Sequence, residues 1–356
     1  MFYRKLGKTN LDLSVVGLGT MTFGEQTPKD EAFKIMDYAF ENGVNFFDTA
    51  EMYPVYPKKE TQGISEKIIG EWVNSRNVRD KVILATKISS FNPKGIGATK
   101  LNWIRGGGDQ LKLDEKNFDE AIQKSLERLQ TNYIDLYQLH WPERNVPIFG
   151  NHDYEHDINE KKWTPVKEIL TILNKFIKKN KIINYGVSNE SAWGLMKFLH
   201  EAKENKFKPP VSIQNPYNLI NRVFDISLSE ISLRENCGLL AYSPLAGGRL
   251  SGKYLKNNKP LNSRFVLWPG RFDRHFTLKG EQAIKKYLKL SKKLKIDAVS
   301  LAHTFVISRP FVTSSIMGVS NLNQLKKNIN SINLIINEKI LHEINKIHNE
   351  DRNPCA

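Results

Sequence analysis

The sequence predicts an α/β protein: a single (β/α)8 TIM barrel of residues 1–356, with an N-terminal β-hairpin and a C-terminal helix. Two observations lead to this fold class. Short apolar runs alternate with longer amphipathic stretches along the chain, and the runs lack a polar face, which is typical of parallel strands covered on both sides. Eight strand–helix steps favour a closed barrel over an open sheet of five or six strands.

The predicted elements follow one another in a regular order. Two β-type runs flank a turn-forming cluster at residues 7–10, which indicates a hairpin before the barrel. Apolar runs predict barrel strands at residues 15–19, 44–48, 81–86, 133–139, 182–187, 211–214, 238–243 and 314–318. Amphipathic spacing predicts helices at residues 30–41, 117–130, 164–179, 191–203, 225–235, 280–294 and 321–332, and a final outer helix at 338–348. Asp114 is a candidate N-cap for the second helix.

Two predicted connections are longer than usual. Residues 89–116 follow the third strand, and residues 141–163 follow the fourth. Both begin at the carboxyl ends of strands, where the active sites of barrels lie, and both carry aromatic side chains such as Trp103 and Tyr154. We therefore expect these long loops after strands 3 and 4 to cover a ligand rather than to be plain surface insertions.

The composition is that of a folded chain. Hydrophobic residues make up 40% of the 356 residues and charged residues 26%, which excludes an intrinsically disordered protein. No uncharged apolar stretch approaches the roughly 18 residues of a membrane-spanning helix, and the first residues lack a signal-peptide segment. Cys237 and Cys355 form neither a disulfide framework nor a paired metal motif, so a cytoplasmic location is expected.

The net charge of +15 raises the question of an anionic partner. Such a charge favours nucleic acids, anionic membranes or phosphorylated small molecules. The most basic helical stretch, residues 285–295, also carries leucines that suit docking on a barrel, so its lysines are interpreted as a solvated outer face. We expect no nucleic-acid partner and no membrane insertion, and the composition leaves the oligomeric state undecided.

Four residues with acid–base chemistry stand at three successive strand ends: Asp48, Tyr53, Lys87 and His140. In a closed barrel these ends converge on one mouth. A tyrosine, with a pKa of about 10, needs assistance to transfer a proton near neutral pH. Lys87 is expected to lower the pKa of Tyr53, and Asp48 to orient Lys87. His140 is expected to position a carbonyl oxygen. Each residue alone fits a structural role, but the set of four favours a proton-transfer site.

The strand ends that carry these residues belong to a longer series of motifs. They read DTAEMY, ATK and LHW, and they are joined by GLGTMTFGEQ at residues 17–26, GVSNE at 186–190, IQNPYN at 213–218 and AYSPLAGGRLSGKY at 241–254. Together, and in this order, the motifs resemble those of the aldo-keto reductases, whose fold is a (β/α)8 barrel. The run AEMYPVYPKKETQG at residues 50–63 is especially similar to the bacterial Tas-type branch of that family.

The resemblance implies an NADPH-dependent oxidoreductase that reduces the carbonyl group of an aldehyde or ketone to an alcohol. Tyr53 would be the general acid, assisted by Lys87, Asp48 and His140. The cofactor would supply hydride while the protein supplies position and a proton, and no metal is implied. The substrate would be a small carbonyl compound bound by Tyr53, Trp103, His140 and Trp141.

The resemblance also assigns cofactor contacts. The nicotinamide end would be held by residues near four strand ends: Gly19, Thr20, Met21, Asp48, Ser188, Asn189, Gln214 and Tyr242. The pyrophosphate and ribose would be covered by the segment that follows: Ser243, Leu245, Gly248, Lys253 and Arg264. The adenosine end would lie on the last strand–helix turn, against Gly318, Ser320, Gln324 and Asn328.

The last turn departs from the family pattern at two positions. Many relatives place an arginine where this chain has Gln324, and an acidic residue where it has Lys327. Gln324 offers only neutral hydrogen bonds to a 2′-phosphate. Ser320, Lys253 and Arg264, with Lys327 as a further candidate, would have to supply the remaining contacts, so the preference for NADPH over NADH rests on them.

Two other functions stay open, and two weaker signals carry less weight. A cofactor-binding regulatory subunit with slow turnover would keep the same four residues. A Schiff-base lyase would use Lys87 as a nucleophile, although it leaves the cofactor motifs unexplained. The sequence of residues 247–253 nearly matches a phosphate-binding P-loop, but Tyr254 stands where that motif has the serine or threonine that binds magnesium. His152 and His156 are a weak candidate metal pair.

Overall fold

The computed structural model describes residues 1–91, 101, 103–105, 111–150, 153–160, 162–255, 258, 260–270 and 273–355. Eight strands form a closed barrel in the order β10-β3-β4-β5-β6-β7-β8-β9, and every neighbouring pair is parallel. The strands are β3 (Val16–Gly19), β4 (Phe46–Asp48), β5 (Ile83–Ile88), β6 (Ile134–Leu139), β7 (Ile182–Ser188), β8 (Ser212–Pro216), β9 (Gly238–Tyr242) and β10 (Val312–Gly318). The predicted (β/α)8 fold is confirmed.

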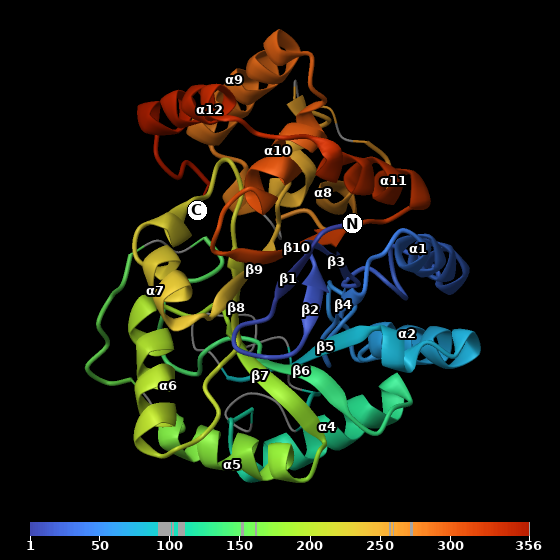
Figure 1. Ribbon diagram of the computed structural model, residues 1–356, viewed down its shortest axis with the longest axis vertical. Helices are drawn as coiled ribbons and strands as arrows, with labels where there is room; N and C mark the ends of the chain where they lie inside the picture. Colours follow the sequence, from blue (N-terminus) through green and yellow to red (C-terminus); the bar gives the residue numbers. More distant parts are fainter. Residues whose placement is uncertain are drawn as a thin grey trace.

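Helices surround the strands, as Figure 1 shows. The ring consists of α1 (Lys29–Glu41), α2 (Ile64–Arg76), α4 (Glu115–Leu129), α5 (Val166–Lys178), α6 (Ala192–Glu204), α7 (Leu228–Glu235), α10 (Ala298–Ile307) and α11 (Leu322–Asn330). The Asp114 carboxylate accepts from the Asn117 N–H and caps α4, as predicted. Two further helices, α9 (Leu278–Leu294) and α12 (Glu338–Glu350), pack against each other beside this ring.

Two of the ring helices, α2 and α10, are absent from the sequence prediction. All seven residues of α10 from Leu301 to Ile307 are buried, the polar His303 and Thr304 included, so the helix shows no polar face to mark its period. Residues 280–294, predicted as a ring helix, form the outer helix α9 instead, and α10 takes its place against β10. Helix α2 is buried on several sides because it also packs against α4.

The hairpin closes the amino-terminal end of the barrel. Strands β1 (Tyr3–Lys5) and β2 (Asp12–Ser14) pair antiparallel, as predicted. Leu6 and Leu13 beside them are fully buried and join Leu136 and Leu240 in the barrel interior. Burial of each leucine contributes about 2 kcal/mol. The carboxyl end of the barrel is thereby left as the face that opens to a cavity.

Several boundaries differ from the prediction. Strand β5 begins and ends two residues later than expected, because residues Arg79–Lys81 form a 3-10 turn, and Lys87 therefore lies inside the strand. Helix α7 begins after a separate 3-10 turn at Val223–Asp225. A third long connection, residues 243–277, joins β9 to α9, and its described residues contain only short turns and the four-residue helix α8 (Arg264–Leu267).

The basic stretch in α9 is an outer face, as predicted. Its apolar residues Ile284, Tyr287 and Leu290 are buried against the protein. Lys285 and Lys293 point outward and form ion pairs with Glu281 at 2.7 Å and Glu343 at 3.2 Å. In the described part of the chain, no helix has both the length and the apolar character needed to cross a bilayer. The organisation of residues 1–356 as one domain stays a prediction.

Candidate active site

The four predicted catalytic residues meet at the carboxyl ends of three adjacent strands. Asp48 is the last residue of β4, Lys87 lies inside β5, and His140 directly follows β6. Lys87 Nζ lies 2.7 Å from an Asp48 carboxylate oxygen and 3.5 Å from the Tyr53 hydroxyl. The Tyr53 and His140 rings meet edge to face, with their centroids 5.7 Å apart. One buried group therefore contains a carboxylate, an ammonium, a phenol and an imidazole.

The backbone after β4 carries Tyr53 back over Lys87. Beyond the end of the strand, Thr49 N–H still donates to the Ala85 carbonyl at 2.8 Å. Glu51 N–H likewise donates to the Lys87 carbonyl at 3.2 Å. The Lys87 ammonium completes the contact by donating to the Thr49 carbonyl at 2.6 Å. The segment is thus tied to β5 on both sides of the lysine before it turns at Tyr53.

Asp48 is the polar centre of the barrel mouth. One carboxylate oxygen accepts from Lys87, and the other accepts from Gln138 Nε2 at 3.1 Å and Gln214 Nε2 at 2.8 Å. The carboxylate is 3% exposed, so the ion pair and both amide donors offset the cost of burying its charge. This arrangement fixes Lys87, which is fully buried, in one orientation.

The expected lowering of the Tyr53 pKa is wrong. Burial, together with the neighbouring Asp48 charge, raises the pKa of Tyr53 well above its ordinary value, and Arg264 only partly offsets this. Burial also lowers the pKa of Lys87, against the opposing effect of Asp48. The physical reason is that the phenol is almost completely desolvated, which disfavours phenolate. The Tyr53 hydroxyl is therefore protonated at neutral pH rather than partly ionised.

His140 is held as a neutral ring. Burial and the Lys87 charge both lower the pKa of His140 well below its ordinary value. The Asn189 amide donates to the His140 carbonyl at 2.8 Å and fixes the backbone at this point. A neutral imidazole keeps one N–H, which suits donation to a carbonyl oxygen.

A cavity of about 1200 Å³ opens over this group. Every residue predicted to bind the cofactor lines it: Gly19, Thr20, Met21, Asp48, Ser188, Asn189, Gln214, Tyr242, Ser243, Leu245, Gly248, Lys253, Arg264, Gly318, Ser320, Gln324 and Asn328. Asn189 and Ser243 have positive φ angles of 53° and 57°, which are uncommon for residues other than glycine and concentrate at functional sites. The cavity therefore follows the carboxyl ends of the strands, as a barrel requires.

Several predicted contacts already have partners within the protein. Tyr242 hydroxyl donates to Asn189 Oδ1 at 2.7 Å, and burial raises the pKa of Tyr242 to about 12. Ser188 hydroxyl donates to the Gln214 carbonyl at 2.7 Å. The Ser320 N–H donates to Gln324 Oε1 at 3.1 Å at the start of α11. These bonds hold the polar lining of the cavity in place.

The cavity also has lining residues that the sequence analysis missed. The polar ones among them include Gln26, Asn262, Ser263, Arg274, His275 and His303. Four of them come from the β9–α9 connection, which has no regular periodicity to mark which residues face inward. Lys253, Arg264, Arg274 and Lys327 outnumber the lining carboxylates Asp48 and Asp297, so the cavity has an excess of positive charge.

The predicted substrate residues are brought together only in part. Tyr53, His140 and Trp141 line the cavity, and Trp141 Nε1 is anchored by donating to the Ser90 carbonyl at 2.6 Å. Trp103 does not line it, although it packs against the apolar cluster that contains Tyr53 and Trp141. Phe149, which the sequence analysis did not assign, does line the cavity, with its ring 6.3 Å from that of Trp141. Tyr154 is 59% exposed and lies outside.

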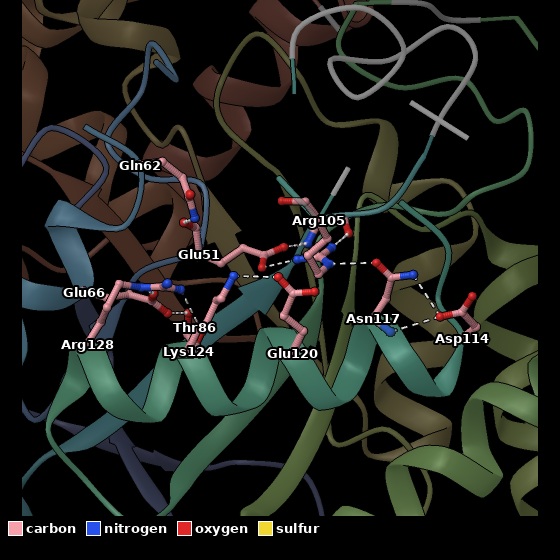
Figure 2. Close-up of polar contacts among 12 residues, drawn as sticks. Glu51, Gln62, Glu66, Thr86, Arg105, Asp114, Asn117, Glu120, Lys124 and Arg128 are labelled. Carbon is pink, nitrogen blue, oxygen red and sulfur yellow. Dashed lines mark hydrogen bonds and ion pairs between the residues drawn. The ribbon is translucent and has the colours of Figure 1, made fainter. Parts of the chain in front are cut away.

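A second polar network lies behind the catalytic group, between β5 and α4 (Figure 2). Glu51 forms a buried ion pair with Arg105, which also donates to Asn117 on α4 at 2.9 Å. Farther along α4, Arg128 donates to Glu66 at 2.6 Å. None of these charged residues was identified from the sequence, because their partners come from distant segments.

Two weaker sequence signals find no support as separate sites. Within the described residues, no three His, Cys, Asp or Glu side chains are grouped so that they could hold a metal ion. His152 lies outside the described residues, and His156 instead contacts the Tyr154 hydroxyl at 3.0 Å. Residues 247–253 form 3-10 turns rather than a loop leading from a strand into a helix, so they are not a P-loop.

Comparisons with known proteins agree with the motifs. The model of the Aldo/keto reductase family matches residues 15–349. The chain is 41% identical over 357 aligned residues to Protein tas of Escherichia coli (strain K12), with 98% of each chain covered. It is 36% identical over 288 residues to the Aldo-keto reductase of Babesia bovis, covering 77% of this chain and 98% of the relative. It is 32% identical over 348 residues to Uncharacterized oxidoreductase YrpG of Bacillus subtilis (strain 168), with 98% and 96% covered.

Proposed function

The chain belongs to the aldo/keto reductase family, and on that premise we propose that it reduces an aldehyde or ketone to an alcohol with NADPH. The observation that carries the proposal is the buried group of Asp48, Tyr53, Lys87 and His140 at the floor of the cavity. The substrate class is a small carbonyl compound whose oxygen reaches Tyr53 and His140.

Tyr53 is the proton donor in this proposal. Its raised pKa keeps the hydroxyl protonated, so it can donate a hydrogen bond to the carbonyl oxygen and then the proton as charge develops there. His140, a neutral ring beside it, donates a second hydrogen bond and orients the oxygen. The Lys87 ammonium, 3.5 Å from the phenol, stabilises the phenolate left after transfer.

The cavity lining fits a dinucleotide phosphate. Lys253 and Arg264 offer positive charge where the pyrophosphate would lie, and the Asn189 and Gln214 amides offer donors and acceptors to a carboxamide. Tyr242 presents an aromatic ring on the cavity wall for stacking. When bound, the nicotinamide supplies the hydride that the protein itself lacks.

The preference for NADPH over NADH rests on the adenosine end. Gln324 is tied to Ser320 and carries no charge, so Lys253, Arg264 and Lys327 would supply the attraction for a 2′-phosphate. Michaelis constants for both cofactors test this. A KM for NADPH at least tenfold lower supports phosphate recognition, and equal efficiency with NADH contradicts it.

The fully buried Lys87 disfavours the Schiff-base alternative. Its ammonium is bonded to Asp48 and to the Thr49 carbonyl, and it does not line the cavity. A nucleophilic amine would need access to the substrate and an uncharged form. We also propose a cytoplasmic location, which the two buried free thiols, Cys237 and Cys355, favour.

NADPH oxidation against a panel of aromatic and aliphatic aldehydes and ketones tests the proposal. We expect turnover with at least one aldehyde and formation of the matching alcohol. Tight NADPH binding without turnover on any member of the panel would contradict the proposal and would favour the regulatory cofactor-binding subunit.

A further inference from the structure

The Arg105 guanidinium joins three segments that surround the catalytic group. It forms a buried ion pair with the Glu51 carboxylate, and it donates to the Ser89 carbonyl at 2.6 Å and to Asn117 Oδ1 at 2.9 Å. Figure 2 shows Arg105 between Glu51 on one side and Asn117, at the start of α4, on the other. Its side chain is 3% exposed, and each of the three guanidinium nitrogens donates to one of these partners.

Each end of this contact is two residues away from a catalytic side chain. Glu51 precedes Tyr53 by two positions, and Ser89 follows Lys87 by two. The Glu51 carboxylate also accepts directly from the Ser89 N–H at 2.6 Å. The Glu51 backbone N–H donates to the Lys87 carbonyl at 3.2 Å. Glu51 therefore clips the Tyr53 segment to the chain of β5 at the Lys87 carbonyl and, two residues later, at the Ser89 N–H.

We infer that Arg105 and Glu51 are positioning residues that set the distance between the Tyr53 hydroxyl and the Lys87 ammonium. The inference rests on the proposed reduction, in which that distance matters. Without Arg105, the Glu51 carboxylate would be left buried and unpaired and would move toward solvent, taking the Tyr53 segment with it. Proton donation depends on position within about 1 Å, so the loss would appear in kcat rather than in cofactor binding.

The chain offers a matched control at the other end of the same strand. Asp135 accepts from the Leu84 N–H of β5 at 2.9 Å and forms an ion pair with Arg79 at 2.8 Å. Arg79 also donates to the Tyr133 carbonyl at 2.8 Å. The chemistry is the same, an arginine and a carboxylate holding a backbone N–H of β5, but no catalytic residue lies beside it.

The test compares Arg105→Met, Arg105→Lys and Arg79→Met in the full chain. We expect Arg105→Met to lower kcat about tenfold to hundredfold, with the dissociation constant for NADPH changed less than threefold. Arg105→Lys should recover part of kcat. Arg79→Met should keep kcat within twofold at a temperature where it is folded, while it lowers Tm.

Backbone hydrogen exchange gives a readout that does not need turnover. Arg105→Met should speed exchange in residues 49–53 and 88–91, and Arg79→Met in residues 83–86 and 133–136. Unchanged exchange in residues 49–53, or equal loss of kcat in the two Met variants, would overturn the inference. A wild-type protein without carbonyl turnover would overturn the proposed function instead, and the exchange pattern would still decide whether Arg105 holds the segment.

Discussion

At each end of β5, an arginine–carboxylate ion pair holds a backbone N–H group, and the two ends differ in the residues that lie beside the pair. At the amino-terminal end, Arg79 and Asp135 hold the backbone at Leu84. At the carboxyl end, Arg105 and Glu51 hold it at Ser89, two residues after Lys87. The comparison teaches that a buried ion pair in a barrel is not functional by its chemistry alone. Its place relative to the open face decides its role.

The energetic setting of the two ends also differs. Arg79 and Asp135 retain 19% and 11% side-chain exposure, whereas Arg105 and Glu51 retain 3% each. Water can therefore partly solvate the first pair if one partner is removed, and it cannot solvate the second without movement of the backbone. Replacing the arginine by methionine should then lower the Tm at the amino-terminal end and disturb the catalytic geometry at the carboxyl end.

The largest effect is expected from Lys87→Met at the carboxyl end. The variant removes the ammonium and leaves Asp48 buried without its counter-ion, so kcat should fall more than about 100-fold and the free energy of unfolding by about 3–5 kcal/mol. Steady-state kinetics and denaturant titration measure both. The double variant Asp48→Asn with Lys87→Met should regain stability without regaining turnover, and recovered turnover would contradict the role of Lys87.

Asp135→Asn tests the amino-terminal end. Burial raises the pKa of Asp135 against the opposing effect of Arg79, so the stability this carboxyl contributes is fully present below its unfolded pKa and is lost as the pH rises through its folded pKa. The destabilisation of the variant should therefore be larger at about pH 4 than at pH 7, with kcat unchanged. A change in kcat beyond about twofold would erase the distinction between the two ends.

Phe149→Ala tests which aromatic side chain at the open face of the barrel contacts the substrate. Phe149 lines the cavity and Trp103 does not, so the first truncation should raise the KM for an aromatic aldehyde about tenfold, and Trp103→Ala should leave it within about twofold. Initial-rate measurements on one aldehyde suffice. The opposite ranking would restore Trp103 as a substrate contact.

The pH dependence should be the smallest effect. The pKa of His140 is lowered and that of Tyr53 is raised, so both side chains keep one protonation state from about pH 6 to pH 9. A plot of log kcat/KM against pH should be flat over this range. A break near 6.5 that disappears in His140→Gln would show that the imidazole titrates during catalysis.

The sequence predicts the barrel, and it predicts that Asp48, Tyr53, Lys87 and His140 lie together, because both predictions depend on local patterns. The apolar runs of the strands and the short motifs around Asp48, Lys87 and His140 each span only a few consecutive residues, so they can be recognised without knowing tertiary contacts. Helix α10 was missed because it is buried on nearly all sides. Arg105 and Phe149 were missed for a different reason: they lie in long irregular connections, where the side chains that face inward are set by tertiary contacts.

The most direct test of the account compares Tyr53→Phe with Tyr137→Phe. Tyr137 is a buried tyrosine on β6, and among the described residues its hydroxyl has no hydrogen-bond partner. With an aldehyde that the wild type reduces, Tyr53→Phe should lower kcat about 10²–10⁴-fold with NADPH binding intact, and Tyr137→Phe should leave kcat within about twofold. Wild-type turnover in Tyr53→Phe would contradict the assignment of Tyr53 as the proton donor.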